Sequence, residues 1–221
     1  MLCGWASIDE HGHARNGKAG DQTGKEVKTG SWYDFEQNVI IRFKDREKAK
    51  KAAKICKAIC NNKHVGYDQN QRTTLFDALK KVDWDPSKLT KNVETDCSAM
   101  MAVCANAVGI KVSKNWYTGN MVKCAKDHPK EFKILRDKKY LNSSKYLKTG
   151  DMILNTSRHV IMALQDGSAS ASGKHEDKIT QVAKAVIAGK YGNGEKRKKK
   201  LAEAGYDYKK VQAKVNELLE R

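Results

Sequence analysis

The run from Cys97 to Gly109 constrains the fold more than any other part of the sequence. Its apolar residues recur at helical spacing, and Gly109 ends the run in the manner of a helix C-cap. Thr95 or Asp96 is suited to cap the N-terminus. The pattern therefore predicts a helix with Cys97 in its first turn, where the helix dipole and free backbone N–H groups favour a thiolate over a thiol.

A predicted hairpin supplies the second constraint. Residues 150–154 and 158–164 have the pattern of two antiparallel strands, with His159 at the start of the second. A base on a rigid strand facing a thiol on a helix N-terminus is the geometry of a papain-like hydrolase. Taken alone, a cysteine is often a small core residue and a histidine that opens a strand is often structural. Together and in this order they indicate catalysis, with Cys97 as nucleophile and His159 as base.

The order of the remaining elements predicts an α+β domain over residues 1–167. Glycine punctuation in residues 1–31 predicts a loop-rich segment, which either lines a cleft or is an ordinary ordered terminus. The other expected elements are a strand at 38–43, helices near 45–61, 73–81 and 120–126, and a strand at 132–135.

The composition changes after Gly167. Residues 168–175 have the composition of a flexible linker, although the alternation of Ser and Ala also fits a final sheet strand. Residues 176–221 predict three short helices, punctuated by Gly189, Asn193 and Gly205. A unit of this size has little core of its own and needs economical packing.

The charge balance is strongly basic. Lys and Arg number 43 against 26 Asp and Glu, which gives a formal net charge of +17. Nucleic acid and the anionic polymers of a bacterial wall are equally suitable partners for such a chain. The basic run at 196–200 has Glu195 and Glu203 nearby and lacks the interleaved aromatic residues that base stacking needs. We therefore expect no nucleic-acid partner.

Cysteine usage points away from disulfides and metals. Six cysteines are too few for a disulfide scaffold in 221 residues, which fits a reducing compartment of synthesis. Cys56, Cys60 and His64 recur every four residues on a helical pattern, but two thiols and one imidazole make an incomplete zinc set. They are better explained as small core residues, and we expect no metal and no other cofactor.

The C-terminal segment from 182 to 216 closely resembles the CW-seven cell-wall-binding repeat (Cpl-seven type) of phage lysozymes. The most specific pieces are Gly-Lys-Tyr-Gly-Asn-Gly-Glu at 189–195 and Tyr-Asp-Tyr at 206–208. The resemblance implies a three-helix bundle at 176–221 that binds peptidoglycan muropeptides without needing choline. The residues expected to contact the wall lie at the helix ends: Gly192, Asn193, Gly194, Arg197, Tyr206, Asp207 and Tyr208.

The first domain resembles phage peptidoglycan hydrolases of the NlpC and CHAP cysteine-peptidase superfamily. The matching pieces are Asp96-Cys97-Ser98 and Arg158-His159-Val160, with further likeness at 20–27, 31–33 and 66–72. The resemblance implies a papain-like fold of helices packed on a small antiparallel sheet. It also implies that Asp96, Ser98 and Tyr67 bind the stem peptide.

The third catalytic residue departs from the family pattern. NlpC-type enzymes usually carry a polar residue on the strand after the histidine strand, and there this chain offers only Ser170, Ala171 and Ser172. Asp166 or Asp21 could orient the imidazole instead, and the sequence does not choose between them.

These features together imply an endolysin that hydrolyses an amide of the peptidoglycan stem peptide. The Asp-Cys-Ser motif favours an endopeptidase over an N-acetylmuramoyl-L-alanine amidase. The alternatives are a basic nucleic-acid-binding protein with an inert Cys97 and a non-catalytic wall-adhesion protein. No stretch approaches the roughly 20 apolar residues of a spanning helix, and residues 1–20 lack an apolar signal core. We expect synthesis in the host cytoplasm without a signal peptide, no membrane insertion, and action on the wall after release.

Overall fold

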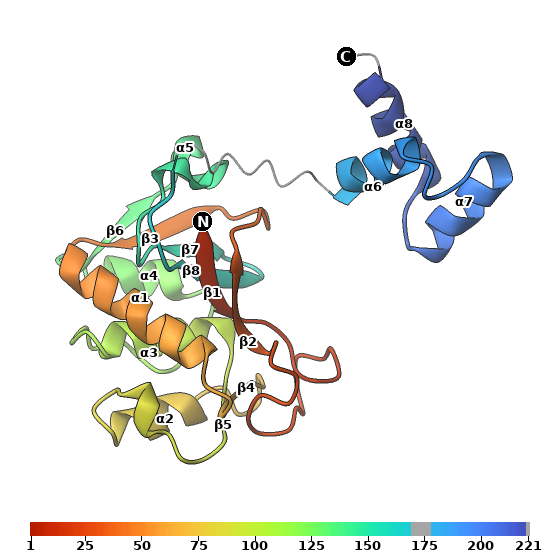
Figure 1. Ribbon diagram of the computed structural model, residues 1–221. Coiled ribbons are helices and arrows are strands. Elements are labelled where there is room, and N and C mark those ends of the chain that lie inside the picture. Colours follow the sequence, from red (N-terminus) through yellow and green to blue (C-terminus); the bar gives the residue numbers. More distant parts are fainter. Residues whose placement is uncertain (169–177, 220–221) are drawn as a thin grey trace. The chain divides into compact units, whose positions relative to one another are not determined.

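The computed structural model describes residues 1–168 and 178–219 (Figure 1). The chain divides into two compact units, Met1–Ser172 and Gly173–Arg221. The predicted linker at 168–175 and the residues Ser170, Ala171 and Ser172 fall almost entirely outside the described residues.

An antiparallel six-stranded sheet forms the centre of the first unit, with the strand order β2-β1-β8-β7-β3-β6. The predicted hairpin is confirmed as β7 and β8, and Asn155 pairs with His159 next to the turn that joins the two strands. The α+β prediction is likewise confirmed. The strands are β1 (Leu2–Ala6), β2 (Val27–Ser31), β3 (Val39–Phe43), β6 (Phe132–Leu135), β7 (Met152–Asn155) and β8 (His159–Ala163).

The N-terminal strand β1 is the main departure from the expected fold. Residues 1–31 were expected to be loop-rich, yet β1 lies inside the sheet between β2 and β8. Only the stretch between β1 and β2 is irregular. Strands pair with β1 on both sides, and its Cys3 and Trp5 side chains are buried in an apolar cluster on one face of the sheet. A five-residue strand is too short for its periodicity to stand out in the sequence.

Helices cover one face of the sheet. The helix α1 (Arg46–Cys60) begins at the cap residue Asp45, and α3 (Cys97–Asn106) contacts α1, β1 and β8. Both helices contribute to the larger apolar core of this unit. The other elements are β4 (Val65–Tyr67), α2 (Thr74–Lys80), η1 (Pro86–Lys88), β5 (Val93–Thr95), α4 (Met121–Lys126), α5 (Lys138–Leu141) and η2 (Ser144–Tyr146), and β4 pairs with β5 in parallel.

A smaller apolar cluster lies on the other face of the sheet. In β7, Met152 and Leu154 belong to the larger core, whereas Ile153 belongs to this second cluster with Trp5 and Trp32. That alternation follows from the two-residue period of a strand. Sheet residues are therefore buried on both faces, which holds β8 rigidly in place.

The second unit consists of three helices around one small core. They are α6 (Lys178–Ile187), α7 (Gly194–Glu203) and α8 (Tyr208–Leu219). The buried core residues are Val182, Ala183, Val186, Leu201, Val211 and Val215. Among all described residues, no helix is both long enough and apolar enough to cross a membrane.

Candidate active site

Cys97 is the first residue of α3, as the sequence predicts. The parallel strand β5 leads into the helix through Asp96, whose extended backbone makes it the N-cap. Its carboxylate accepts hydrogen bonds from Ala99 N at 2.7 Å and Ser98 Oγ at 2.9 Å. The thiol is thereby fixed at the helix start, beside the free N–H groups of the first turn.

The resting thiol is not a thiolate, and the sequence expectation is wrong on this point. Burial raises the pKa of Cys97 to about 12, and the charge of Asp96 raises it further. The backbone amides of Val160 and Ser98 and the charge of Arg72 lower the pKa of Cys97, but by less than burial raises it. Only 7% of Cys97 is exposed, so the loss of water outweighs the helix-start effect.

His159 is neutral at physiological pH. It is the first residue of β8, and burial lowers its pKa to about 4, although the charge of Asp96 raises it. The edge of the Phe35 ring packs against it, with centroids 5.5 Å apart. A neutral imidazole can accept a proton, so His159 is available as a base down to mildly acidic pH.

Cys97 and His159 come near each other where α3 packs against β8. The Cys97 thiol interacts with the backbone amide of Val160, the residue next to His159. No hydrogen bond joins the thiol to the imidazole in this structure. One pocket of about 320 Å³ is lined by Cys97, and another of about 470 Å³ is lined by His159. Arg158 lines both pockets, so the two pockets share one wall residue.

Asp96 and Ser98, which the resemblance assigns to substrate binding, are held by Arg72. The guanidinium Nε lies 2.6 Å from Asp96 Oδ2, and Nη2 donates to Ser98 Oγ at 3.2 Å and to the carbonyl of Trp116. Both residues line the Cys97 pocket. Their internal contacts show that they also fix the start of α3. Sequence reasoning missed Arg72, whose only signal was its place in the 66–72 stretch.

Tyr67 lies close to Cys97 in the core. Burial raises its pKa to about 12, and the charges of Cys97 and Asp96 add to the shift. Its hydroxyl accepts a hydrogen bond from Gln69 Nε2 at 3.2 Å. The side chain is 4% exposed and is not among the residues that line the two pockets. The structure thus brings Tyr67 to the site but places it behind the pocket surface.

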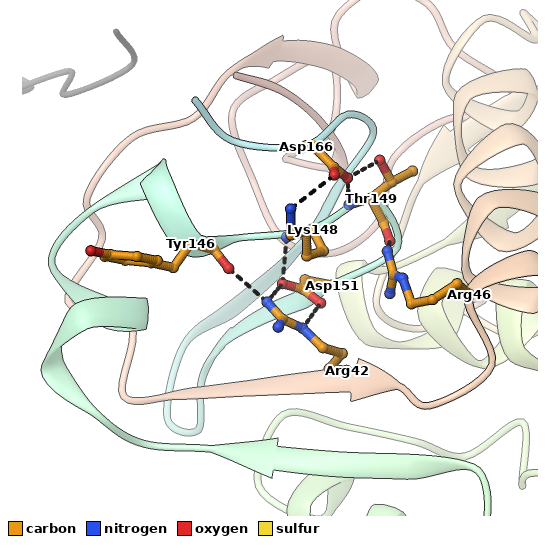
Figure 2. Close-up of polar contacts among 7 residues, drawn as sticks. All are labelled: Arg42, Arg46, Tyr146, Lys148, Thr149, Asp151 and Asp166. Carbon is orange, nitrogen blue, oxygen red and sulfur yellow. Dashed lines mark hydrogen bonds and ion pairs between the residues drawn. The ribbon is translucent and has the colours of Figure 1, made fainter. Parts of the chain in front are cut away.

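Asp166 does not orient His159. It lies beyond the far end of β8, where it accepts hydrogen bonds from Thr149 N and Oγ1 and pairs with Lys148 (Figure 2). These contacts lower its pKa to about 2. Strand geometry accounts for this, because five residues of extended chain separate the two ends of β8 by about 17 Å.

Asp21 does not orient His159 either. Its carboxylate caps its own turn, accepting from Thr23 N at 3.0 Å and Gly24 N at 2.7 Å. A polar residue lies opposite His159 on each side of β8: Asn155 in the β7–β8 pair, and Ser7 on the β1 side. The β1–β8 pairing aligns Cys3 with Ala163 and Gly4 with Met162, and its continuation places Ser7 opposite His159. Both residues line the same pocket.

The loop between β1 and β2 reaches the site. Arg15 lines the Cys97 pocket, which favours the cleft-lining interpretation of this segment. Buried carboxylates anchor the loop through its backbone: Gly20 N donates to Glu94 at 2.6 Å, and Gln22 N donates to Glu26 at 2.7 Å. Glu26 also accepts from Tyr67 N at 3.1 Å, which ties the loop to β4.

Glu94 gives a prediction for pH dependence. Burial raises its pKa to about 8, helped by the charges of Glu26, Asp68 and Glu10. The native state thus keeps a proton that the unfolded chain releases above its ordinary pKa of 4.5. The contribution of this proton to the free energy of unfolding is complete below about pH 4.5 and is lost as the pH rises through about 8. Glu94→Gln has no proton to release, so its stability should fall less over this range.

Urea unfolding at pH 5 and pH 8.5 checks this prediction. The exposed Glu47→Gln on α1 is the matched control and should follow the wild type. An equal fall for Glu94→Gln and the wild type would show that Glu94 is ionised in the folded protein.

The side chains of Cys56, Cys60 and His64 do not come together at one site. The sulfurs of Cys56 and Cys60 face β1, where a Cβ added to Gly4 would lie 2.9 and 3.0 Å from them. His64 turns to Asn92, with Nδ1 and Oδ1 2.8 Å apart. Among the described residues, no group of three or more His, Cys, Asp or Glu is arranged to hold a metal ion.

In the second unit, Arg197 makes hydrogen bonds to three other residues. Its guanidinium donates to Gly192 O at 3.0 Å, Asn193 Oδ1 at 2.9 Å and Gln212 Oε1 at 3.0 Å. Asp207 accepts from Lys210 N at the start of α8. The remaining residues expected to contact the wall divide into two groups: Gly192 and Gly194 adopt positive φ, and Tyr206 and Tyr208 pack partly buried on the core.

Comparison with known families identifies the first unit. A model of the endolysin-like domain matches residues 3–170. The chain belongs to the endolysin-like domain family. A second model, the CW_7 repeat, matches residues 180–219. No curated protein and no solved structure matches the chain.

The two matches agree with the division of the structure. Apart from Leu2 of β1, the endolysin-like domain match contains the whole six-stranded sheet, together with Cys97, His159 and both pockets. The CW_7 repeat contains all of α7 and α8 and most of α6. An endolysin-like domain joined to a cell-wall-binding repeat supports a protein that acts on the cell wall.

Proposed function

We propose that this chain is a peptidoglycan hydrolase that cleaves an amide of the stem peptide by cysteine catalysis. The observation that carries the proposal is the contact of Cys97, at a helix start, with the backbone amide of Val160 beside His159. Cys97 and His159 line two pockets that share Arg158. A cysteine-bearing helix packed on an antiparallel sheet that carries the histidine also supports a papain-like fold of the NlpC and CHAP type. The Asp96-Cys97-Ser98 motif favours the endopeptidase over the amidase.

The chemistry begins from two neutral groups. Because the pKa of Cys97 is raised and that of His159 is lowered, a resting thiolate–imidazolium pair is disfavoured. His159 instead takes the thiol proton as the sulfur attacks the amide carbonyl, forming the carbon–sulfur bond. Backbone N–H groups at the start of α3 are placed to stabilise the oxyanion.

The second half returns the enzyme to its starting state. Protonated His159 gives its proton to the departing amine as the carbon–nitrogen bond breaks, leaving a thioester on Cys97. Water, deprotonated by His159, then attacks the thioester. As the carbon–sulfur bond breaks, His159 returns the proton to the Cys97 sulfur and the carboxylic acid is released. The Cys97 pocket presents Arg15 and Arg158, which suit the carboxylates of a stem peptide.

The second unit is proposed to hold the enzyme on the wall. Its CW_7 match supports cell-wall binding. Arg197 is better assigned to shaping the turn at 192–194 than to touching muropeptides, since three acceptors occupy its guanidinium. The exposed lysines of α7 add attraction to anionic wall polymers that weakens as salt screens it.

Mass spectrometry of fragments released from polymer-stripped peptidoglycan tests the function. The full chain should release fragments with new termini inside the stem peptide. A chain ending at Ser172 should cleave soluble muropeptides at the full-length rate but release less from whole walls, because tethering raises the local substrate concentration.

New termini between the sugar and the first alanine would identify an amidase instead. Wall binding without any released fragment would identify an adhesion protein. Tight DNA binding at physiological salt, with no binding to stripped walls, would support the basic nucleic-acid-binding alternative.

A further inference from the structure

The pocket beside His159 has a composition unlike the rest of this basic protein. It has a volume of about 470 Å³, and its walls include Tyr33, Asp34, Phe35 and Glu36. Two carboxylates and two aromatic rings therefore come from four consecutive residues, in a chain whose net charge is +17. The function proposed above uses only the imidazole and Arg158 of this pocket.

The aromatic side of the pocket is a continuous series of ring contacts, each tilted or edge-on. Trp5 and Tyr33 have ring centroids 5.5 Å apart, and Tyr33 and Phe35 have centroids 5.3 Å apart. Phe35 in turn packs against His159. These contacts bring the Phe35 ring directly next to the His159 imidazole. The faces of aromatic rings attract cations as well as apolar groups.

The loop that carries the carboxylates is fixed before any ligand binds. Asn155, opposite His159 in the β7–β8 pair, donates to the carbonyl of Glu36 at 2.8 Å. The buried Gln37 accepts from Phe35 N at 3.2 Å and donates to the carbonyl of Leu141. Asp34 accepts from Glu36 N at 2.9 Å, which closes the turn. A preformed loop binds a ligand without the entropy cost of ordering it.

The charges in the pocket are accessible. Among the described residues Asp34 makes no ion pair, and Glu36 pairs with Arg158 at 3.0 Å. The Glu36 and Arg158 side chains are 74% and 68% exposed, so the pair contributes little free energy and opens readily. Arg158 also lines the Cys97 pocket and can remain there when a ligand cation takes its place at Glu36.

We propose that this pocket is a subsite for a free primary ammonium group on the amine half of the cleaved stem peptide. The inference rests on the proposed function, in which His159 protonates the departing amine, so the amine half lies on the imidazole side. Asp34 and Glu36 supply the charge, and Tyr33 and Phe35 supply the cation–π faces. A cross-linked side chain has an amide in place of this ammonium, so the enzyme should favour stems that are not cross-linked.

Equilibrium binding of two synthetic stem peptides tests the subsite. Each peptide contains a diamino acid on the amine side of the bond to be cleaved. The side-chain amine of this residue is free in one peptide and acetylated in the other, and the peptides are otherwise identical. The probe protein is the full chain carrying Cys97→Ala, so that neither peptide is cleaved. We expect the free-amine peptide to bind about tenfold more tightly. Adding Asp34→Asn and Glu36→Gln should remove this advantage, whereas adding Glu47→Gln, an exposed acid on α1, should preserve it.

The same peptides given to the active enzyme separate this proposal from the proposed function. The wild type should cleave both with similar kcat, and acetylation should raise KM. Equal affinity of the two peptides, no measurable binding of either, or an advantage that survives in the Asp34/Glu36 variant would overturn the subsite, even if both were cleaved. A retained affinity difference with no cleavage of either peptide would support the ammonium site and refute the endopeptidase, because these peptides lack the sugar-linked amide that an amidase cleaves.

Discussion

Replacing Cys97 with alanine is expected to reduce the release of muropeptides by about 10⁴-fold or more, because no other group can form the thioester. The fold should be retained. Asp96 still caps α3 through Ala99 N, and Arg72 still holds Asp96. Fragment release followed by mass spectrometry measures the activity, and thermal unfolding measures the stability.

Cys104 on the same helix provides the matched control. It is fully buried in the larger core and is not among the residues lining the two pockets. Cys104→Ala should therefore keep near-normal turnover while losing about 1 kcal/mol of stability from the small cavity left behind. Near-normal turnover in Cys97→Ala would show that the nucleophile is misassigned.

Replacing Arg42 with methionine is expected to cost about 3–5 kcal/mol of unfolding free energy. Arg42 donates to the two oxygens of Asp151 at 2.8 and 2.7 Å, and the Asp151 side chain is completely buried (Figure 2). Without Arg42, Lys148 N at 2.8 Å is the main remaining donor to this carboxylate. Burial already raises the pKa of Asp151 in spite of Arg42, so an unpaired charge there is strongly disfavoured.

Lys148→Met is the control for the Arg42 variant. The Lys148 side chain pairs with Asp166 at 3.1 Å, and both groups are about half exposed, so its loss should cost less than about 1 kcal/mol. Its backbone amide still donates to Asp151. Urea unfolding of both variants measures the difference. A similar small loss in the two variants would show that water or a proton compensates Asp151 when Arg42 is absent.

Local sequence signals predicted the elements that carry the two candidate catalytic residues. The apolar spacing after Cys97 and the cap at Asp96 depend on neighbours within a few positions, and α3 begins where they indicate. The β7–β8 hairpin is likewise a local structure, and His159 opens its second strand. Periodicity and capping determine such features, so no tertiary information was needed.

Local sequence signals did not predict the surroundings of Cys97 and His159. The sequence favoured a thiolate at Cys97, but the packing of α3 against β8 removes water and raises its pKa. It offered Asp166 and Asp21 as partners of His159, but each is satisfied by its own neighbourhood. Ser7 lies opposite His159 only because β1 inserts beside β8, a pairing between residues more than 150 positions apart.

The sequence by itself determined the two-part organisation, the helix bearing Cys97, the strand bearing His159 and the net positive charge, because these depend on composition and short-range spacing. The tertiary structure decided which side chains share a pocket, which charges are paired and which protons are held. Those properties depend on burial and on contacts between distant segments, as the carboxylates of Asp34 and Glu36 beside His159 illustrate. Burial changes the free energy of a charge by several kcal/mol, and no local pattern records it.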